Sequence, residues 1–448
     1  MPKKLPTIPA PDQLKLRKSL SIPGLLALVR KEFEQIKEYR IKTISYKLTD
    51  VLMSALAMFG LKYPSLLQFD RSSRDQCTRA NLSNLYGVER APSDSPMREI
   101  LDPVAPEDLR PAFRRVHREL QRQKALAKYQ FLGGYLMSVD GTGQFSSTQI
   151  KCDECCSRTL RNGTEQYYHQ LLAAVIVHPE QKTVLPLFPE AITRQDGESK
   201  NDCERNAAKR LLPAIRAAFP KLQLIVLEDS LAANAPHLRL LHELLMSYII
   251  VVKETDHAYL KAVVDTQMKS GQGRTIELHE DDTTRQFHYV NQVPLNQSNP
   301  DLLVNYLEYH EIKGGKTIYY CSWITDIELT PDNVFQIMRA GRARWKIENE
   351  TFNTLKNQNY HLEHNYGHGK RHLATVLATL MRLHFLLDQV QELACPLFQA
   401  ARNSYSSRCQ FWEILRAYWL LRFLPSWEIL FKCIIYRIKL EVEQLDTS

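Results

Sequence analysis

Three acidic residues, Asp140, Asp229 and Glu348, have the residue type and the setting of a divalent-metal site. Asp140 ends an apolar run that begins at Tyr135, and Asp229 ends one that begins at Leu222. We therefore expect both carboxylates at strand ends, where open α/β sheets gather their ligands. Carboxylate oxygens bind Mg²⁺ or Mn²⁺, and two such ions about 4 Å apart promote the cleavage of a phosphodiester. The three residues thus predict a two-metal site for phosphodiester chemistry.

The third acidic residue is predicted to lie on a helix. Arg344, Glu348, Phe352 and Leu355 follow each other at helical spacing, which predicts one stripe that faces the core. Glu350 lies two residues on, about 200° around a regular helix, and is the second choice for the third carboxylate. The structural alternative makes the two aspartates turn residues and Glu348 a salt-bridge partner of Arg344.

The composition fits a globular protein of two to three domains. The 448 residues include 58 Lys and Arg against 50 Asp and Glu, a net charge of +8 that suits a polyanionic partner. No apolar run approaches the ~18 residues of a membrane span, and the start, with Lys3 and Lys4, lacks the apolar segment of a signal peptide. We therefore expect a cytoplasmic, nucleoid-associated protein without a membrane partner, with its nine cysteines reduced.

The hydrophobic pattern between residues 131 and 252 predicts the core fold. Five strands are expected, at residues 135–139, 169–177, 183–188, 222–227 and 248–252. One helix is expected to start near Asp202, with Pro213 in its middle, and another to cover residues 236–247. Three strands, a helix, a strand, a helix and a strand predict an α/β protein with an RNase H-like mixed sheet.

The flanking regions are predicted from changes in this pattern. Thr330 offers an N-cap for a long helix that runs to about Lys356, and the preceding region contains short strand-like pieces. Helices are expected near both termini, including residues 48–56 and 109–129. The predicted organisation is a helical region at 1–130, core at 131–252, a β-rich insertion at 253–330, final core helices at 331–390 and a helical C-terminal region at 391–448.

Three segments resemble the DDE transposases of bacterial insertion sequences, particularly the insertion-sequence-four group. They are Val-Asp-Gly-Thr at 139–142, Leu-Glu-Asp at 227–229 and Arg-Ala-Arg-Trp-Lys-Ile-Glu-Asn-Glu-Thr-Phe-Asn-Thr-Leu-Lys at 342–356. That group has a Tyr, two residues, Arg, three residues, Glu, six residues, Lys signature. Arg344 and Glu348 match its centre, whereas Gly341 takes the Tyr position and Lys356 comes one residue after the Lys position.

The resemblance implies an enzyme that hydrolyses DNA at transposon ends and transfers the freed 3′-hydroxyl to a target. It also implies that the helical region at 1–130 is the DNA-end-binding region. Its partners would be double-stranded DNA, with terminal inverted repeats and target DNA, and a second copy of the chain in a synaptic homodimer. Its cofactors would be two Mg²⁺ or Mn²⁺ ions on Asp140, Asp229 and Glu348. The alternatives are a non-catalytic DNA-binding derivative and an RNase H-like nuclease that cuts without joining.

A set of mostly basic residues is predicted to contact DNA: Arg344, Lys356, Lys253, Lys370, Arg371 and Trp323. Lys370 and Arg371 lie in a loop that also carries His361, His364, His368 and His372. Arg205, Lys209 and Arg210 are further candidates. Trp323 is expected either to stack on an unpaired base or to pack in the core, while Trp345 is expected in the core.

A group of cysteines suggests a possible zinc site. Cys152 and Cys155 have the Cys-x-x-Cys spacing of two thiolate ligands, and His169 and Cys203 are the candidates that would complete the set. The alternative is a loop with free thiols.

Overall fold

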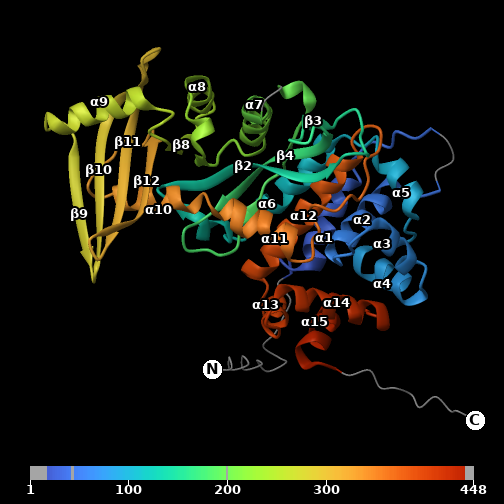
Figure 1. The fold of residues 1–448 in the computed structure, drawn as a ribbon. Coiled ribbons are helices and arrows are strands. Elements are labelled where there is room, and N and C mark those ends of the chain that lie inside the picture. Colours follow the sequence, from blue (N-terminus) through green and yellow to red (C-terminus); the bar gives the residue numbers. More distant parts are fainter. Residues whose placement is uncertain (1–17, 42–44, 198–199, 439–448) are drawn as a thin grey trace, which may run out of the picture. The chain divides into compact units, whose positions relative to one another are not determined.

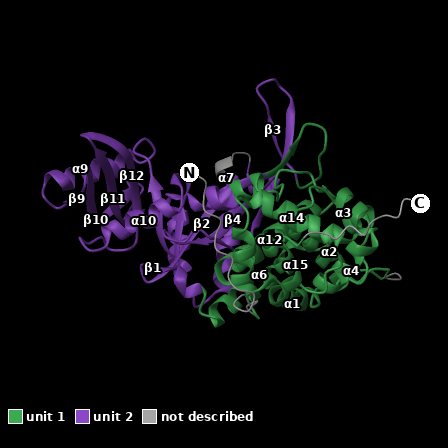
Figure 2. Cartoon of the chain, turned by 90° about the horizontal axis from the view of Figure 1, so that it is seen from below, with its two compact units in different colours: residues 1–125, 144–154, 353–448 green, residues 126–143, 155–352 purple. Residues whose placement is uncertain are grey.

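The computed structural model describes residues 18–41, 45–197 and 200–438. Lys3 and Lys4 of the predicted N-terminal segment lie outside the described residues. The chain divides into two compact units, which Figure 2 shows in different colours. Unit 1 comprises residues 1–125, 144–154 and 353–448, and unit 2 comprises residues 126–143 and 155–352. The predicted N- and C-terminal helical regions thus contribute to the same unit.

Unit 2 is built on a mixed sheet with the strand order β3-β4-β2-β7-β8-β12-β11-β10-β9. The central strands are β2 (Gly134–Ser147), β4 (Glu165–Val177), β7 (Leu224–Glu228) and β8 (Ser247–Val252). Four short strands pair with β2 or β4: β1 (Gln130–Phe131), β3 (Cys156–Thr159), β5 (Leu185–Pro186) and β6 (Glu190–Ile192). β2, β7 and β8 are parallel neighbours. The α/β class and the RNase H-like core are thereby confirmed.

Two helices between the central strands lie on one side of the sheet, α7 (Lys200–Ala218) and α8 (Ala235–Glu243) (Figure 1). The predicted helix start at Asp202 is too late, because α7 already includes Lys200. Pro213 lies inside α7 without ending it. A proline removes one helical hydrogen bond, and the fully buried Leu211, Leu212 and Ile215 anchor the helix around it.

The predicted insertion extends the same sheet. Its strands are β9 (Arg274–Glu280), β10 (Thr283–Asn296), β11 (Asn299–Lys313) and β12 (Lys316–Thr325). They form antiparallel hairpins, and β12 joins the core by pairing antiparallel with β8. A helix that the sequence analysis did not predict, α9 (Ala258–Lys269), lies across these strands (Figure 1). Only Leu260 and Val264 of α9 are buried, which is too short an apolar stripe to predict a helix from sequence.

The predicted long helix after the extension is divided into three segments. They are α10 (Val334–Ala343), a π-helix (Ile347–Phe352) and, in unit 1, α11 (Asn353–Asn357). The N-cap is Asn333 rather than the predicted Thr330, whose backbone N–H donates to Asn333 Oδ1. The π-helix also corrects the predicted stripe, because its i+5 hydrogen bonding breaks the 3.6-residue period. Glu348 is exposed, whereas Arg344 and Phe352 are buried.

Unit 1 is helical apart from the end of β2. It contains α1 (Ile22–Phe33), α2 (Leu48–Gly60), α3 (Leu66–Ser73), α4 (Gln76–Tyr86), α5 (Asp94–Leu101), α6 (Arg110–Arg122), α12 (Leu373–Ala394), α13 (Pro396–Asn403), α14 (Arg408–Leu421) and α15 (Trp427–Tyr436). The predicted helix at 109–129 ends early, at Arg122, and Lys124 has a left-handed backbone.

The core of unit 1 forms around α12, which packs against α1, α2, α5, α6 and α13. By length and composition alone α12 could cross a membrane, which corrects the expectation that no apolar run approaches that length. The most apolar part of this helix is 94% buried within the protein, as in the core helix of a globular fold. A buried ion pair between Lys62 Nζ and Asp388 Oδ2, 2.7 Å apart, fixes α12 against the residue that follows α2.

Candidate active site

The register of two parallel strands brings the first two carboxylates together. Ser138 of β2 pairs with Leu227 of β7. Asp140 lies two residues further along β2, and Asp229 lies two residues further along the chain, just after β7 ends at Glu228. Neighbouring strands lie about 4.8 Å apart. Both aspartates line one small cavity, in keeping with the predicted convergence.

Asp140 occupies an interior position of β2 rather than its end. The Gly141-Thr142-Gly143 segment, predicted to be an open strand end, continues the strand to Ser147. The Asp140 side chain is 25% exposed, and its Oδ1 accepts a hydrogen bond from the backbone N–H of Gly141 at 2.8 Å. The carboxylate therefore has a fixed orientation and remains reachable from solvent.

The predicted residues Asp229, Arg344 and Glu348 all act electrostatically on Asp140. Burial raises the pKa of Asp140 to about 6; Arg344 opposes this rise, and the carboxylates of Asp229 and Glu348 add to it. Arg344 Nη1 lies 3.6 Å from Asp140 Oδ2. Three carboxylates that repel each other in a half-buried setting form a donor set suited to divalent cations, which would relieve the repulsion.

Asp229 is positioned by the turn that follows β7. It caps the 3₁₀ turn Ser230–Ala232, and its Oδ1 accepts a hydrogen bond from the backbone N–H of Leu231 at 3.0 Å. The side chain is half-buried. The capping bond fixes the orientation of this carboxylate, which lines the same small cavity as Asp140.

The choice between Glu348 and Glu350 is informed by their neighbours. Glu348 raises the pKa of Asp140, whereas Glu350 acts on Lys346, whose pKa burial lowers and Glu350 partly restores. Lys346 in turn donates to the backbone carbonyl of Gln181 at 2.5 Å. Glu348 therefore belongs to the carboxylate group around Asp140, and Glu350 to a different neighbourhood.

Arg344 is buried beside the carboxylates. The Ser138 hydroxyl donates to the Arg344 carbonyl at 3.0 Å, which ties the end of α10 to β2. Its guanidinium carbon lies 4.7 Å from the ring centre of Trp345, in a cation–π contact, and its Nε has no hydrogen-bond partner among the described residues. Trp345 is 50% exposed, which corrects the expectation that it belongs to the core.

The two aspartates line a small cavity of about 30 Å³. Besides Asp140 and Asp229, it is lined by Glu204, Glu228 and His237. His237 Nε2 lies 2.6 Å from Glu228 Oε2, and although burial lowers the pKa of His237, the Glu228 carboxylate raises it overall. The sequence analysis missed all three residues, although Glu228 directly precedes Asp229.

Residues 147–386 match the model of the family described as transposase DDE domain. The match covers more than half of the 448 residues. The chain belongs to the transposase DDE domain family. It is therefore a metal-dependent enzyme that cleaves and transfers DNA strands. Asp229 and Glu348 lie within the matched residues, and Asp140 lies just before them, so the position of Asp140 rests on the β2–β7 register.

Two further comparisons of the transposase, with curated proteins and with solved structures, add little to the family assignment. A comparison with curated proteins gives no match. Among solved structures, the chain is similar to the one described as cryo-EM structure of piggyBac transposase synaptic complex with hairpin DNA. The two chains share 10% identity with a TM-score of 0.38, over 99% of this chain and 88% of that chain. The family match remains the basis of the assignment.

The basic residues predicted to contact DNA have different settings in the transposase. Lys253, after β8, is exposed. Lys370 and Arg371 have exposed side chains on a loop whose backbone N–H groups donate to the Asp102 carboxylate. Lys356 is half-buried and forms an ion pair with Glu363 at 3.0 Å.

The additional candidates on α7 also differ. Arg210 forms ion pairs with Glu190 and Asp196, which removes it from the set of free phosphate contacts. Arg205 and Lys209 remain exposed.

Trp323 cannot stack on a base in this structure. It is 1% exposed on β12, and a Cβ added at Gly341 would lie 2.5 Å from its Nε1. The predicted stacking role is therefore corrected in favour of the alternative, core packing. The same contact explains the missing signature Tyr, because the Trp323 indole occupies the space beside position 341.

The cysteines predicted to bind zinc are placed in both units. In unit 2, Cys155 Sγ lies 3.4 Å from His169 Nε2, and both residues are buried. Cys203 Sγ donates to the Gly197 carbonyl at 3.1 Å. Cys152 lies in unit 1 and is half-buried. Cys155 and His169 therefore form a pair of possible ligands within one unit.

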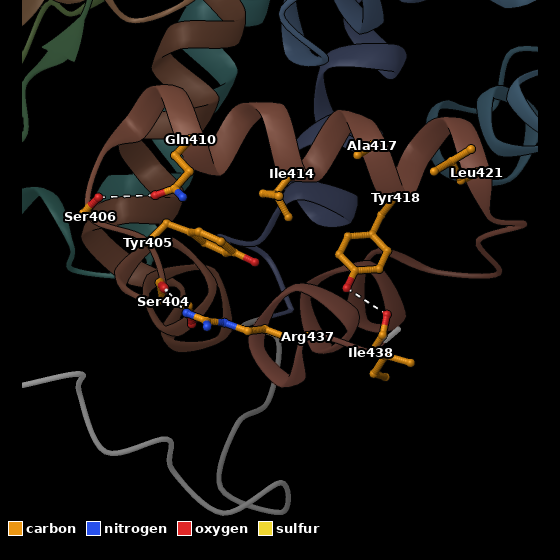
Figure 3. Close-up of a pocket in the computed structure, with 10 residues that line it drawn as sticks. All are labelled: Ser404, Tyr405, Ser406, Gln410, Ile414, Ala417, Tyr418, Leu421, Arg437 and Ile438. Carbon is orange, nitrogen blue, oxygen red and sulfur yellow. Dashed lines mark hydrogen bonds between the residues drawn. The ribbon is translucent and has the colours of Figure 1, made fainter. Parts of the chain in front are cut away.

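A cavity of about 560 Å³ in unit 1 lies between α14 and the residues after α13 and α15 (Figure 3). Figure 3 shows Tyr405, Tyr418 and Arg437 around it, with the Tyr418 hydroxyl donating to the Ile438 carbonyl at 2.9 Å. The described residues that line it include no carboxylate and no histidine. This cavity offers no metal ligands of the kind found around Asp140.

Proposed function

We propose that this transposase cleaves the ends of a mobile element with two Mg²⁺ or Mn²⁺ ions on Asp140, Asp229 and Glu348. One observation supports the proposal: Asp140 on β2 and Asp229 just after β7 follow neighbouring parallel strands and line one cavity, and the charges of Asp229 and Glu348 both raise the pKa of Asp140. Bound there, the metals would lower the pKa of the attacking water and stabilise the charge on the leaving oxygen. Hard oxygen donors suit these ions, and bound cations would relieve the repulsion from Asp229 and Glu348 that contributes to the raised pKa of Asp140.

The protein residues position the reacting groups. Arg344 supplies a fixed positive charge beside Asp140, suited to contact a DNA phosphate once metal ions take over the carboxylates. In the first step the water oxygen forms a bond to phosphorus, the bond from phosphorus to the 3′-oxygen breaks, and that oxygen takes a proton. In the second step the freed 3′-hydroxyl attacks a target phosphodiester in the same way.

The exposed basic residues proposed to contact DNA phosphates are Lys253 in unit 2 and Lys370 and Arg371 in unit 1. Lys356 joins them if its ion pair with Glu363 opens. Trp345, exposed next to Arg344, replaces Trp323 as the aromatic residue able to stack on a base. Arg344, Glu348 and the β-rich extension support membership of the insertion-sequence-four group. The proposed substrates are terminal inverted repeats and target DNA, bound by a synaptic homodimer in the cytoplasm at the nucleoid.

A labelled element end tests this function. The full chain is incubated with the end, target DNA and Mg²⁺ or Mn²⁺, and nicked and joined products are separated. We expect both products from the wild type and neither from Asp140→Ala, Asp229→Ala or Glu348→Ala, all of which should still bind the end. Cleavage without joining would favour the RNase H-like nuclease, and binding without cleavage the non-catalytic derivative.

The predicted zinc site is tested separately. We propose that Cys155 and His169, 3.4 Å apart, contribute to a Zn²⁺ site. Cys152 and Cys203 are the further predicted ligands, and Cys203 is the weakest because its thiol already bonds to a backbone carbonyl. Zinc content should fall in Cys155→Ser and remain in Cys203→Ser. Equal zinc content in the wild type and Cys155→Ser would refute it.

A further inference from the structure

A second group of metal-ligating side chains lies in the β-rich extension. His288 on β10 and Glu308 and His310 on β11 each offer one ligand atom, and these atoms lie within 4.8 Å of one another. The β10–β11 register pairs His288 directly with Glu308, and His310 lies two residues further along β11 on the same face. Two rigid neighbouring strands therefore hold the three side chains together.

The surrounding hydrogen bonds orient the two ligands that are directly opposed. His288 Nδ1 lies 2.9 Å from the Thr275 hydroxyl on β9, which leaves Nε2 as the free ring nitrogen. Glu308 Oε2 accepts from Lys261 Nζ at 2.6 Å and from the Tyr306 hydroxyl at 2.9 Å. Such partners on the non-ligating atoms are typical of imidazole and carboxylate metal ligands.

The atoms that these hydrogen bonds leave as ligands lie close together. Glu308 Oε1 lies 2.9 Å from His310 Nε2, and the ring centres of His288 and His310 are 5.7 Å apart. Around tetrahedral zinc, ligand atoms about 2 Å from the ion lie roughly 3.3 Å from each other. Binding would require separations of up to 4.8 Å between ligand atoms to shorten by at most about 1.5 Å, which rotation of the imidazoles can supply.

The Glu308 carboxylate contacts both Lys261 and His310, through Oε2 and Oε1 respectively. Lys261 itself comes from α9, which lies across the strands. The group thus links α9, β10 and β11, and the ammonium occupies only one carboxylate oxygen.

We propose that His288, Glu308 and His310 bind one divalent cation that prefers imidazole ligands, with Zn²⁺ as the natural choice and a water in the fourth position. Two imidazoles and one carboxylate form a common open zinc set, whereas Mg²⁺ prefers sites made of oxygen alone. This site is separate from the carboxylates of the proposed function. Its role is to fasten β10 to β11 beneath α9.

Cobalt binding tests the site in the full chain. Co²⁺ is titrated in excess Mg²⁺, and the visible spectrum is recorded, since cobalt on thiolates has charge-transfer bands that cobalt on imidazole and carboxylate lacks. We expect the wild type to bind one equivalent of Co²⁺ whose spectrum lacks thiolate charge-transfer bands. His288→Ala and His310→Ala should each lose it, and Thr275→Val should weaken it by about tenfold, as loss of a supporting hydrogen bond does.

Two controls keep the result independent of folding and of the active site. His279 on β9 is an exposed histidine bonded to the Thr284 hydroxyl, so His279→Ala should bind cobalt like the wild type. The active-site double variant Asp140→Asn, Asp229→Asn should also keep this equivalent, even if it has lost DNA cleavage. Metal-free circular dichroism should be alike for all variants. Absence of this equivalent from the wild type, or its retention in folded His288→Ala and His310→Ala, would overturn the proposal.

Discussion

Replacing Asp140 by Asn should stabilise the metal-free protein at neutral and alkaline pH. The pKa of Asp140 is raised from its ordinary value of 3.8 to about 6, first by burial and further by Asp229 and Glu348. A carboxyl group whose pKa is higher in the folded than in the unfolded state destabilises the fold as it ionises. This cost should be absent below pH 4, grow between pH 4 and pH 6, and be constant above.

The size of the effect follows from the shift. One pKa unit corresponds to 1.36 kcal/mol, so the rise from 3.8 to about 6 corresponds to about 3 kcal/mol. Because the side chain is 25% exposed, solvent screening makes this an upper limit. Urea unfolding of unit 2, followed between pH 4 and pH 8 with a chelator present, should show Asp140→Asn gaining roughly 1–3 kcal/mol over the wild type at pH 8.

Two comparisons decide the outcome. Asp256→Asn, at an exposed aspartate, should show no such gain. Saturating Mn²⁺ should reverse the order, because the ions bind the native wild type and lose a ligand in Asp140→Asn. A gain that is equal at pH 4 and pH 8 would refute the electrostatic reasoning, as would a wild type that Mn²⁺ fails to stabilise.

Further predictions concern the residues that the structure reassigns. Glu348→Gln should lower end cleavage by more than about a hundredfold, since even the partners of metal ligands contribute 10–100-fold, while Glu350→Gln should stay near wild type in the same gel assay. Trp323→Ala should lower the free energy of unfolding by about 3–5 kcal/mol, as expected for a buried aromatic. Trp345→Ala should leave stability within about 1 kcal/mol and weaken end binding by about 1–3 kcal/mol in a gel-shift titration, and equal behaviour of the two tryptophan variants would contradict their assignments. Gly341→Tyr, which restores the signature residue, should destabilise the protein by about 1–3 kcal/mol, and adding Trp323→Ala should recover part of that loss in a double-mutant cycle.

The central sheet could be predicted because its strands are continuous apolar runs. Leu224 to Glu228 is buried throughout, and such runs are typical of parallel strands covered on both faces. Asp140 directly follows the first of these runs and the Glu228-Asp229 pair follows the other, which is why the two aspartates were predicted to share a site. What the sequence did not contain was the register, which pairing between strands far apart in the chain decides.

The errors have physical causes of a similar kind. The stripe through Glu348 assumed a 3.6-residue period, which the π-helix at Ile347–Phe352 breaks. Trp345 lies in the turn between α10 and this π-helix, where its side chain is 50% exposed. Trp323 is buried because its strand joins the core sheet at β8 and its indole meets Gly341, two contacts that no local pattern shows.

The β-rich insertion was predicted as short strands because Gly and Asn residues interrupt its sequence. These residues mark hairpin turns instead: Gly314 and Gly315 both have left-handed backbones between β11 and β12. The long strands of the insertion bury alternate residues, such as Phe287 and Tyr289 of β10.

The most direct measurement of the central claim is the anomalous scattering of Mn²⁺ in crystals of the protein bound to an element end. Two peaks about 4 Å apart are predicted, each about 2.1 Å from carboxylate oxygens of Asp140, Asp229 or Glu348. Peaks held by Glu204, Glu228 or Glu350 without these three residues would contradict it, and so would a cleavage-competent complex with no manganese between β2 and β7.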